Sequence, residues 1–131
     1  MAVESVNIVF VYGTLKRGFY NHHYLHGSVY LGEFITDAKY TMYDYGEYPA
    51  VIVRGHTAIS GELFQVEHGV MKDLDELEEY PLFYDRIQIH TPHGLAWMYV
   101  VNQVQPGAIV VDGNWLPEAS PDSDSSWNTP V

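Results

Sequence analysis

A single amphipathic helix stands among many short segments that favour β-strands. In residues 70–80 apolar side chains recur at helical spacing, and Pro81, which has no backbone N–H, ends the pattern. The other regular segments are short runs rich in β-branched and aromatic residues, bounded by turn-forming residues. This pattern predicts a small α+β domain with a sheet long enough to curl around an interior pocket.

The first predicted strand covers residues 7–12 and ends at Gly13, where a loop begins. A short helical segment is predicted from Asn21, a good N-cap residue, to Leu25. Further strands are predicted at residues 28–34, 38–43, 50–53, 59–66, 85–90 and 95–101.

Length and charge restrict the function classes. The 131 residues suit one domain, which we place at residues 1–116, followed by an acidic, irregular tail at residues 117–131 in which Trp127 is the one large aromatic residue. The formal charge of −11 disfavours binding to nucleic acids and to anionic membranes. The chain has no cysteine, and we find no signal peptide and no apolar stretch of about 18 residues. We therefore expect a soluble, cytoplasmic protein without disulfides or thiolate metal sites.

Glu78 is the most informative candidate for chemistry. On a helical wheel its side chain lies about 50° from the centre of the apolar face, whereas the neighbouring acidic residues lie about 90° or more away and resemble a solvated face. Burial raises the pKa of a carboxyl group towards neutrality, which suits a general acid and base. The structural alternative is that Glu78 pairs with a base such as Arg86 at the rim of the core.

A second candidate site is the corner formed by Tyr12, Gly13, Thr14 and Leu15. Glycine permits close approach, and backbone N–H groups beyond the end of a strand are free to bind an anion such as a carboxylate. The corner matches neither of the common nucleotide-binding glycine motifs. A plain turn at the end of a strand would explain the same residues.

Other polar residues give weaker signals. His22 and His26 have the spacing of a helical metal pair but no evident third ligand, so we predict no metal site. Lys16 and Arg17 could steer an anionic substrate, or could be exposed solubilising residues. The Tyr99 hydroxyl could line a pocket, although packing alone would also account for this residue.

Two separate segments resemble the signatures of a known family. Residues 9–18, VFVYGTLKRG, followed by Asn21 and His22, are similar to the opening of the gamma-glutamylcyclotransferase-like superfamily, closest to its gamma-glutamylamine cyclotransferase branch. Residues 74–86, LDELEEYPLFYDR, resemble its second signature. Residues 46–50 and 109–115 resemble weaker blocks of the family, so the resemblance extends to about Trp115.

The resemblance implies a small mixed β-barrel with flanking helices and a pocket at the corner of residues 12–15. It implies release of 5-oxoproline from a γ-glutamyl amine or amide without a cofactor, and Glu78 matches the catalytic glutamate of the family. Tyr12, Gly13, Thr14, Leu15 and Tyr99 would then contact the small-molecule substrate. The alternative is a non-catalytic module that binds a small ligand in the same pocket. The amine that leaves and the oligomeric state stay open.

Overall fold

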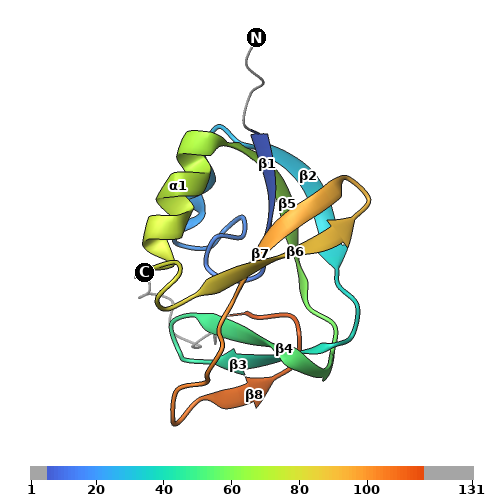
Figure 1. Cartoon of the computed structure of the whole chain (residues 1–131), viewed down its shortest axis with the longest axis vertical. Helices are drawn as coiled ribbons and strands as arrows, with labels where there is room; N and C mark the ends of the chain where they lie inside the picture. Colours follow the sequence, from blue (N-terminus) through green and yellow to red (C-terminus); the bar gives the residue numbers. More distant parts are fainter. Residues whose placement is uncertain (1–5, 117–131) are drawn as a thin grey trace.

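The computed structural model describes residues 6–116, which form eight strands, one α-helix and one 3-10 helix (Figure 1). The strands are β1 (Val6–Val11), β2 (Val29–Ile35), β3 (Tyr40–Asp44), β4 (Pro49–Thr57), β5 (Ser60–Glu67), β6 (Asp85–Thr91), β7 (Gly94–Val100) and β8 (Ile109–Val111). The helices are η1 (His22–Leu25) and α1 (His68–Leu77).

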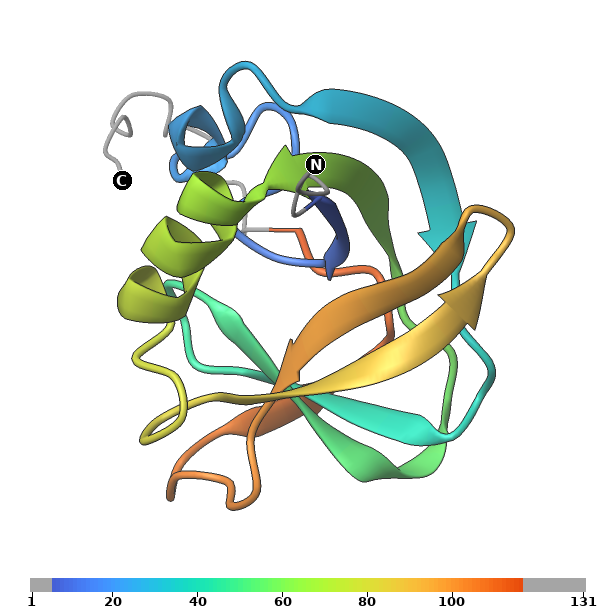
Figure 2. The same cartoon turned by 45° about the horizontal axis from the view of Figure 1, so that its top comes forward.

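The strands pair into two sheets. The larger has the order β2-β5-β1-β7-β6, with β1 and β7 parallel and the other neighbours antiparallel. The smaller has the order β4-β3-β8 and is antiparallel. Figure 2 shows how strongly β2 and β5 curve. The α+β class is confirmed, whereas strand pairing within residues 6–116 leaves the sheets unclosed and does not confirm a complete barrel.

Strand β1 lies at the centre of the larger sheet and is covered on both faces. Side chains alternate along a strand, so Val9 and Val11 join a core cluster with Leu74 of α1. Phe10 points the other way and joins a second cluster with Met42 of the smaller sheet. This double burial explains why β1 is a nearly continuous apolar run, and it fixes the end of β1 firmly beside α1.

Helix α1 buries Met71 and Leu74 and ends in a backbone turn that carries the acidic residues. Glu78 still has right-handed helical angles, and its N–H donates to the Leu74 carbonyl over 2.9 Å. Glu79 has a φ of 56°, and the N–H groups of Glu79 and Tyr80 donate back to the carbonyls of Glu76 and Asp75. These bonds form a Schellman motif. The helical-wheel phase therefore extends to Glu78 and is lost at Glu79.

Several expectations change in the structure. The predicted strands are confirmed within a few residues, but β8 was not predicted. Asn21 precedes η1 without a side-chain capping bond, so the expected N-cap bond is wrong. The predicted tail at 117–131, with Trp127, lies outside the described residues. No helix within residues 6–116 has the length and apolar character required to span a bilayer.

Candidate active site

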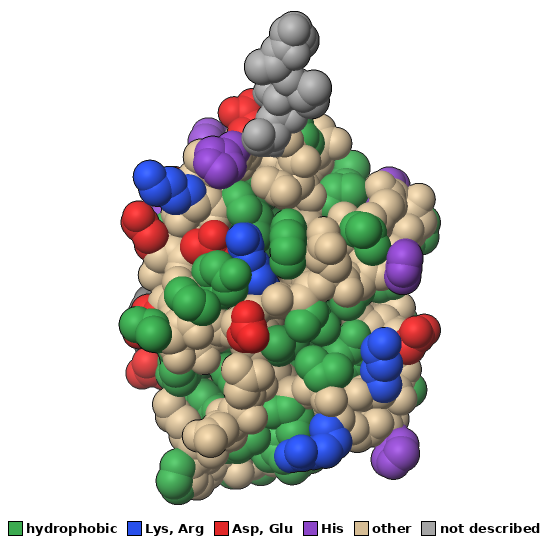
Figure 3. Space-filling view, viewed as in Figure 1, with side chains coloured by type: hydrophobic (Ala, Val, Ile, Leu, Met, Phe, Trp, Pro, Cys, Tyr) green, Lys and Arg blue, Asp and Glu red, His purple; other side chains and the backbone are tan. Residues whose placement is uncertain are grey.

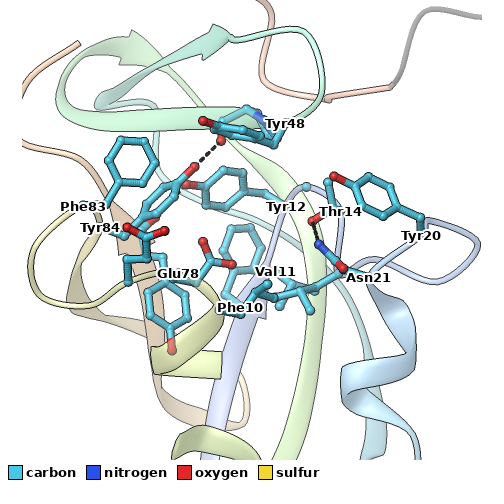
Figure 4. A pocket seen from close by; sticks show the side chains of 16 residues that line it. Phe10, Val11, Tyr12, Thr14, Tyr20, Asn21, Tyr48, Glu78, Phe83 and Tyr84 are labelled. Carbon is cyan, nitrogen blue, oxygen red and sulfur yellow. Dashed lines mark hydrogen bonds between the residues drawn. The ribbon is translucent and has the colours of Figure 1, made fainter. Parts of the chain in front are cut away.

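A pocket of about 230 Å³ opens where β1 ends (Figure 4). Its walls come from the loop after β1, the start of β4 and the segment that follows α1. The lining residues are Phe10, Val11, Tyr12, Gly13, Thr14, Leu15, Tyr20, Asn21, Tyr48, Pro49, Leu77, Glu78, Glu79, Phe83, Tyr84 and Tyr99. All six residues predicted from the sequence to form the site therefore line the same cavity.

The Glu78 carboxyl group faces this cavity without a partner. Among residues 6–116 its side chain takes part in no hydrogen bond or ion pair, because Arg86 binds Asp75 instead. The side chain retains partial exposure through the open pocket, yet burial raises its pKa from 4.5 to about 7. A carboxyl group with this pKa can accept and donate a proton near neutral pH.

Three buried tyrosines surround Glu78, but their hydroxyl protons are donated elsewhere. Tyr12 donates to the Tyr99 carbonyl and Tyr84 to the Pro49 carbonyl, each over 2.7 Å. Tyr99 donates to Asp75 Oδ1, also over 2.7 Å. Burial and the nearby Glu78 charge raise the pKa of all three phenols. Of these four groups, only Glu78 is suited to proton exchange near neutral pH, and the Tyr99 hydroxyl is not offered to the cavity as a free donor.

The loop at residues 13–15 lines the pocket, and its carbonyl groups are bonded within the protein. The Gly13 carbonyl accepts from the Lys16 N–H, the Thr14 carbonyl from the Asn21 N–H, and the Leu15 carbonyl contacts His22 Nδ1 at 2.9 Å. Within residues 6–116 the amides of this loop donate no hydrogen bond. Such N–H groups at the wall of a pocket are suited to binding an oxygen anion.

Glycine is required at position 13 for steric reasons. A Cβ atom there would lie 2.7 Å from Pro49 Cδ and 2.8 Å from Cγ, well inside van der Waals contact. The Pro49 carbonyl in turn holds the Tyr84 hydroxyl. Gly13 therefore allows the loop to pack directly against the start of β4 in the wall of the pocket.

Asp75 does not belong to a simple solvated face. Its Oδ1 atom accepts hydrogen bonds from the Tyr99 hydroxyl and from Arg86 at 3.1 Å. The Arg86 guanidinium lies 4.4 Å from the ring centres of both Tyr80 and Trp97. This network ties the end of α1 to β6 and β7. It corrects the expectation that Asp75 is solvated, and it removes Arg86 as a partner of Glu78.

The two basic residues after the loop lie away from the pocket. Lys16 is only 6% exposed, and its Nζ atom donates to the Trp115 carbonyl over 2.8 Å. Arg17 stacks on Tyr30 and pairs with Glu62 at 3.5 Å. Both expectations for Lys16, that it steers a substrate or only solubilises, are therefore wrong. Basic side chains are also scattered over the face in Figure 3.

His22 and His26 lie at the loop after β1 and at the protein surface, respectively. His22 contacts the Leu15 carbonyl, and His26 is exposed after η1. No group of three or more His, Cys, Asp or Glu side chains in residues 6–116 is arranged to hold a metal ion.

Several lining residues were missed from the sequence. Tyr48 comes from the turn before β4, Phe83 and Tyr84 follow Pro81, and Asn21 donates from Nδ2 to the Thr14 hydroxyl over 3.0 Å (Figure 4). The aromatic residues in the turns next to Pro49 and Pro81 could have indicated these lining positions, because a large apolar ring in a turn is usually packed against other side chains.

Fold and site together define a small α+β protein built around an aromatic pocket that holds one unpaired, buried carboxyl group beside free backbone amides. The family model described as gamma-glutamyl cyclotransferase, AIG2-like, matches residues 9–117. The chain belongs to this family.

Relatives in sequence and structure agree with this assignment. A Vibrio cholerae protein is 42% identical over 110 residues, which are 83% of this chain and 95% of the relative. The Escherichia coli gamma-glutamylcyclotransferase family protein YtfP is 35% identical over 109 residues, covering 82% and 95%. The solution structure of ytfP from Escherichia coli matches with a TM-score of 0.68 over 83% of this chain and 96% of that chain. A Pyrococcus horikoshii crystal structure matches with a TM-score of 0.71 at 25% identity, covering 82% and 88%.

Proposed function

We propose that the protein is a gamma-glutamyl cyclotransferase that releases 5-oxoproline from a γ-glutamyl amine, with Glu78 as the general acid and base. The observation that carries this proposal is the unpaired Glu78 carboxyl group, with a pKa of about 7, in the same cavity as the free amides of residues 13–15. Family membership supports cyclotransferase chemistry in general. The substrate and the role of Glu78 are inferred from the pocket.

Starting from the protonated α-amine, the reaction moves two protons from the α-nitrogen to the departing nitrogen. The substrate's α-amine attacks its own γ-carbonyl carbon, which forms the ring C–N bond of 5-oxoproline and breaks the original amide C–N bond. The α-amine lies beside the substrate's free α-carboxylate and is protonated at neutral pH, so a base must remove a proton. Glu78 takes that proton, and then a second one as the attacking nitrogen becomes an amide N–H. It passes both to the departing nitrogen, which leaves as an ammonium group, and water and redox partners are not consumed.

The rest of the pocket holds the glutamyl chain in a folded conformation. The amides of Gly13, Thr14 and Leu15 bind a substrate oxygen, where backbone donors compensate for the lack of a basic side chain in the lining. Tyr12 and Tyr99 form rigid walls because their hydroxyl groups are already bonded. Holding amine and carbonyl together provides part of the roughly 7–11 kcal/mol available from orientation.

The direct test is incubation of the purified protein with a panel of γ-glutamyl amines and γ-glutamyl dipeptides, with 5-oxoproline measured by chromatography. We expect catalytic release from at least one γ-glutamyl amine. If γ-glutamyl compounds raise the unfolding temperature but no 5-oxoproline forms, the protein is a binding module and the proposal is wrong.

Gly13→Ala should reduce 5-oxoproline release by about 10²-fold, because the new methyl group overlaps Pro49 and must displace the loop amides. It should also lower the free energy of unfolding by about 1–3 kcal/mol. Gly69→Ala is the matched control, since a Cβ there meets no atom within 4 Å and the residue lies in α1. Steady-state kinetics and urea unfolding of both variants measure the effects. Equal kinetics for the two variants would contradict the role of the loop.

A further inference from the structure

A second cavity, of about 220 Å³, lies outside the active site. Its walls are the end of β2 (residues 33–35), the start of β5 (residues 60–62), Lys16 from the loop after β1, and Asn114 from the segment after β8. Among residues 6–116 it shares no lining residue with the pocket that holds Glu78. Strands β2 and β5 pair side by side in the larger sheet (Figure 1), so one wall is a continuous two-stranded surface.

The wall that follows β8 is held in place by close contacts. The Gly113 carbonyl accepts a hydrogen bond from the Ser60 N–H over 2.8 Å. A Cβ atom at Gly113 would overlap the Ala58 carbonyl, so this segment packs directly on the turn between β4 and β5. Trp115 is buried, and its ring centre lies 5.8 Å from that of Phe19. The cavity is therefore enclosed by parts of the folded core, as in a preformed binding site.

Lys16 brings to this cavity a charge that the protein satisfies only in part. The residue is more than nine-tenths buried, and its Nζ atom donates to the Trp115 carbonyl over 2.8 Å and lies 4.8 Å from the ring centre of Phe19. An ammonium group has three N–H donors, and within residues 6–116 Nζ has no second acceptor and no ion pair. Burial lowers the pKa of Lys16, which the charge of Glu62 opposes. A carboxylate oxygen in the cavity would supply the missing acceptor.

Two glutamates stand opposite each other in the two-stranded wall. Glu33 of β2 is paired with Glu62 of β5, and directly opposite residues project from the same face of a sheet, where like charges repel. Glu62 accepts from the Arg17 N–H over 2.8 Å and lies 3.5 Å from Arg17 Nε. Within residues 6–116 Glu33 belongs to no ion pair. A cationic group between the two carboxylates would relieve their repulsion.

The charges of the lining favour a zwitterion. Two carboxylates against one ammonium group repel a simple anion, and Lys16 repels a simple cation. A molecule with one carboxylate and one ammonium group satisfies both, and the Ser60 hydroxyl and the Asn114 amide are further donors for the carboxylate. Phe34 and Ile35 supply an apolar surface, and the volume is below the roughly 300–1,000 Å³ of sites for drug-sized ligands. These features fit an amino acid with a short apolar side chain.

We propose that this cavity binds a small zwitterionic amino acid, whose carboxylate accepts from Lys16 Nζ and whose ammonium group lies between Glu33 and Glu62. The amino acid is bound and released unchanged, so the inference does not depend on the proposed reaction. Lys16 also connects this site to the active-site loop, because its N–H donates to the Gly13 carbonyl over 3.1 Å.

The test is an NMR titration of the ¹⁵N-labelled full-length protein with L-alanine, propionate and ethylamine, which carry both charges, only the carboxylate and only the ammonium group. L-Alanine should cause saturable shifts of the amide signals of residues 33–35, 60–62 and 114. The other two probes should bind about tenfold more weakly or less, since each lacks one charge-assisted hydrogen bond. The absence of saturable shifts at these residues, or binding of propionate or ethylamine as tight as that of L-alanine, would overturn the inference.

Variants assign the two charges. Lys16→Met and Glu33→Lys should each weaken L-alanine binding by about tenfold, and Glu33→Lys should also raise the affinity for propionate relative to L-alanine. Glu33 is exposed, so its variant tests the site even if Lys16→Met is unstable. Lys39→Met and Glu67→Lys are the matched controls, because both residues are exposed and lie outside the cavity lining, and both variants should keep the wild-type Kd. Wild-type affinity for L-alanine in Glu33→Lys would also overturn the inference.

Discussion

Replacing Glu78 with Gln should reduce the turnover of γ-glutamyl amines by about 10²- to 10⁴-fold, the usual contribution of a positioned acid and base. Gln has nearly the same shape but cannot carry the proton between the two nitrogens. Because the Glu78 side chain makes no hydrogen bond or ion pair within residues 6–116, the substitution breaks no contact of the fold. The kcat for 5-oxoproline release, with circular dichroism to check folding, measures the effect.

Two further measurements make this result specific. Glu76→Gln should keep wild-type kcat, since Glu76 is exposed and lies outside the pocket. In the wild type, kcat/KM should rise with pH through about 7 as Glu78 ionises, and fall at more alkaline pH as the substrate's α-amine loses its proton. Between these two ionisations Glu78 is deprotonated and the substrate's α-amine is protonated, which is the state that reacts. Wild-type turnover by Glu78→Gln would rule out the assigned role.

The elements with strong local patterns were predictable from the sequence. Residues 7–12 become β1 because both faces of that strand are buried, and α1 follows from the spacing of Met71 and Leu74. The helix ends several residues before Pro81, where the prediction placed its end, because the backbone already leaves the helical conformation at Glu79. Strand β8 was missed because it is three residues long and pairs only with the distant β3.

The site was predictable where local geometry decides it. Glu78 faces the pocket because the helical phase persists one residue beyond α1, and the Gly13 corner follows from the end of β1. The partners of Asp75, Lys16 and Arg86 were not predictable. Each of these partners lies at a distance in the sequence, as in the bond from Lys16 to the Trp115 carbonyl. The spacing of apolar residues does not predict such contacts.

Glu78→Gln should also make the protein more stable at alkaline pH. Burial raises the Glu78 pKa from 4.5 to about 7, so the folded state binds this proton more tightly than the unfolded state. The stabilising effect of the bound proton is complete below about pH 4.5, and it is lost as pH rises through about 7. Above that pH the ionised, buried carboxylate lowers the free energy of unfolding by about 2–3 kcal/mol.

Glutamine cannot ionise and avoids this cost. Urea unfolding should therefore show Glu78→Gln more stable than the wild type by about 2–3 kcal/mol near pH 8, with the difference shrinking towards zero near pH 4.5. Glu76→Gln, at an exposed position, should show no such pH-dependent gain. A constant difference between Glu78→Gln and the wild type across this range would mean that the carboxyl group is not held in a desolvated site. A gain in stability that appears over the same pH range as activity would show that one buried carboxyl group causes both, because the environment that costs stability also sets the pKa needed for proton transfer.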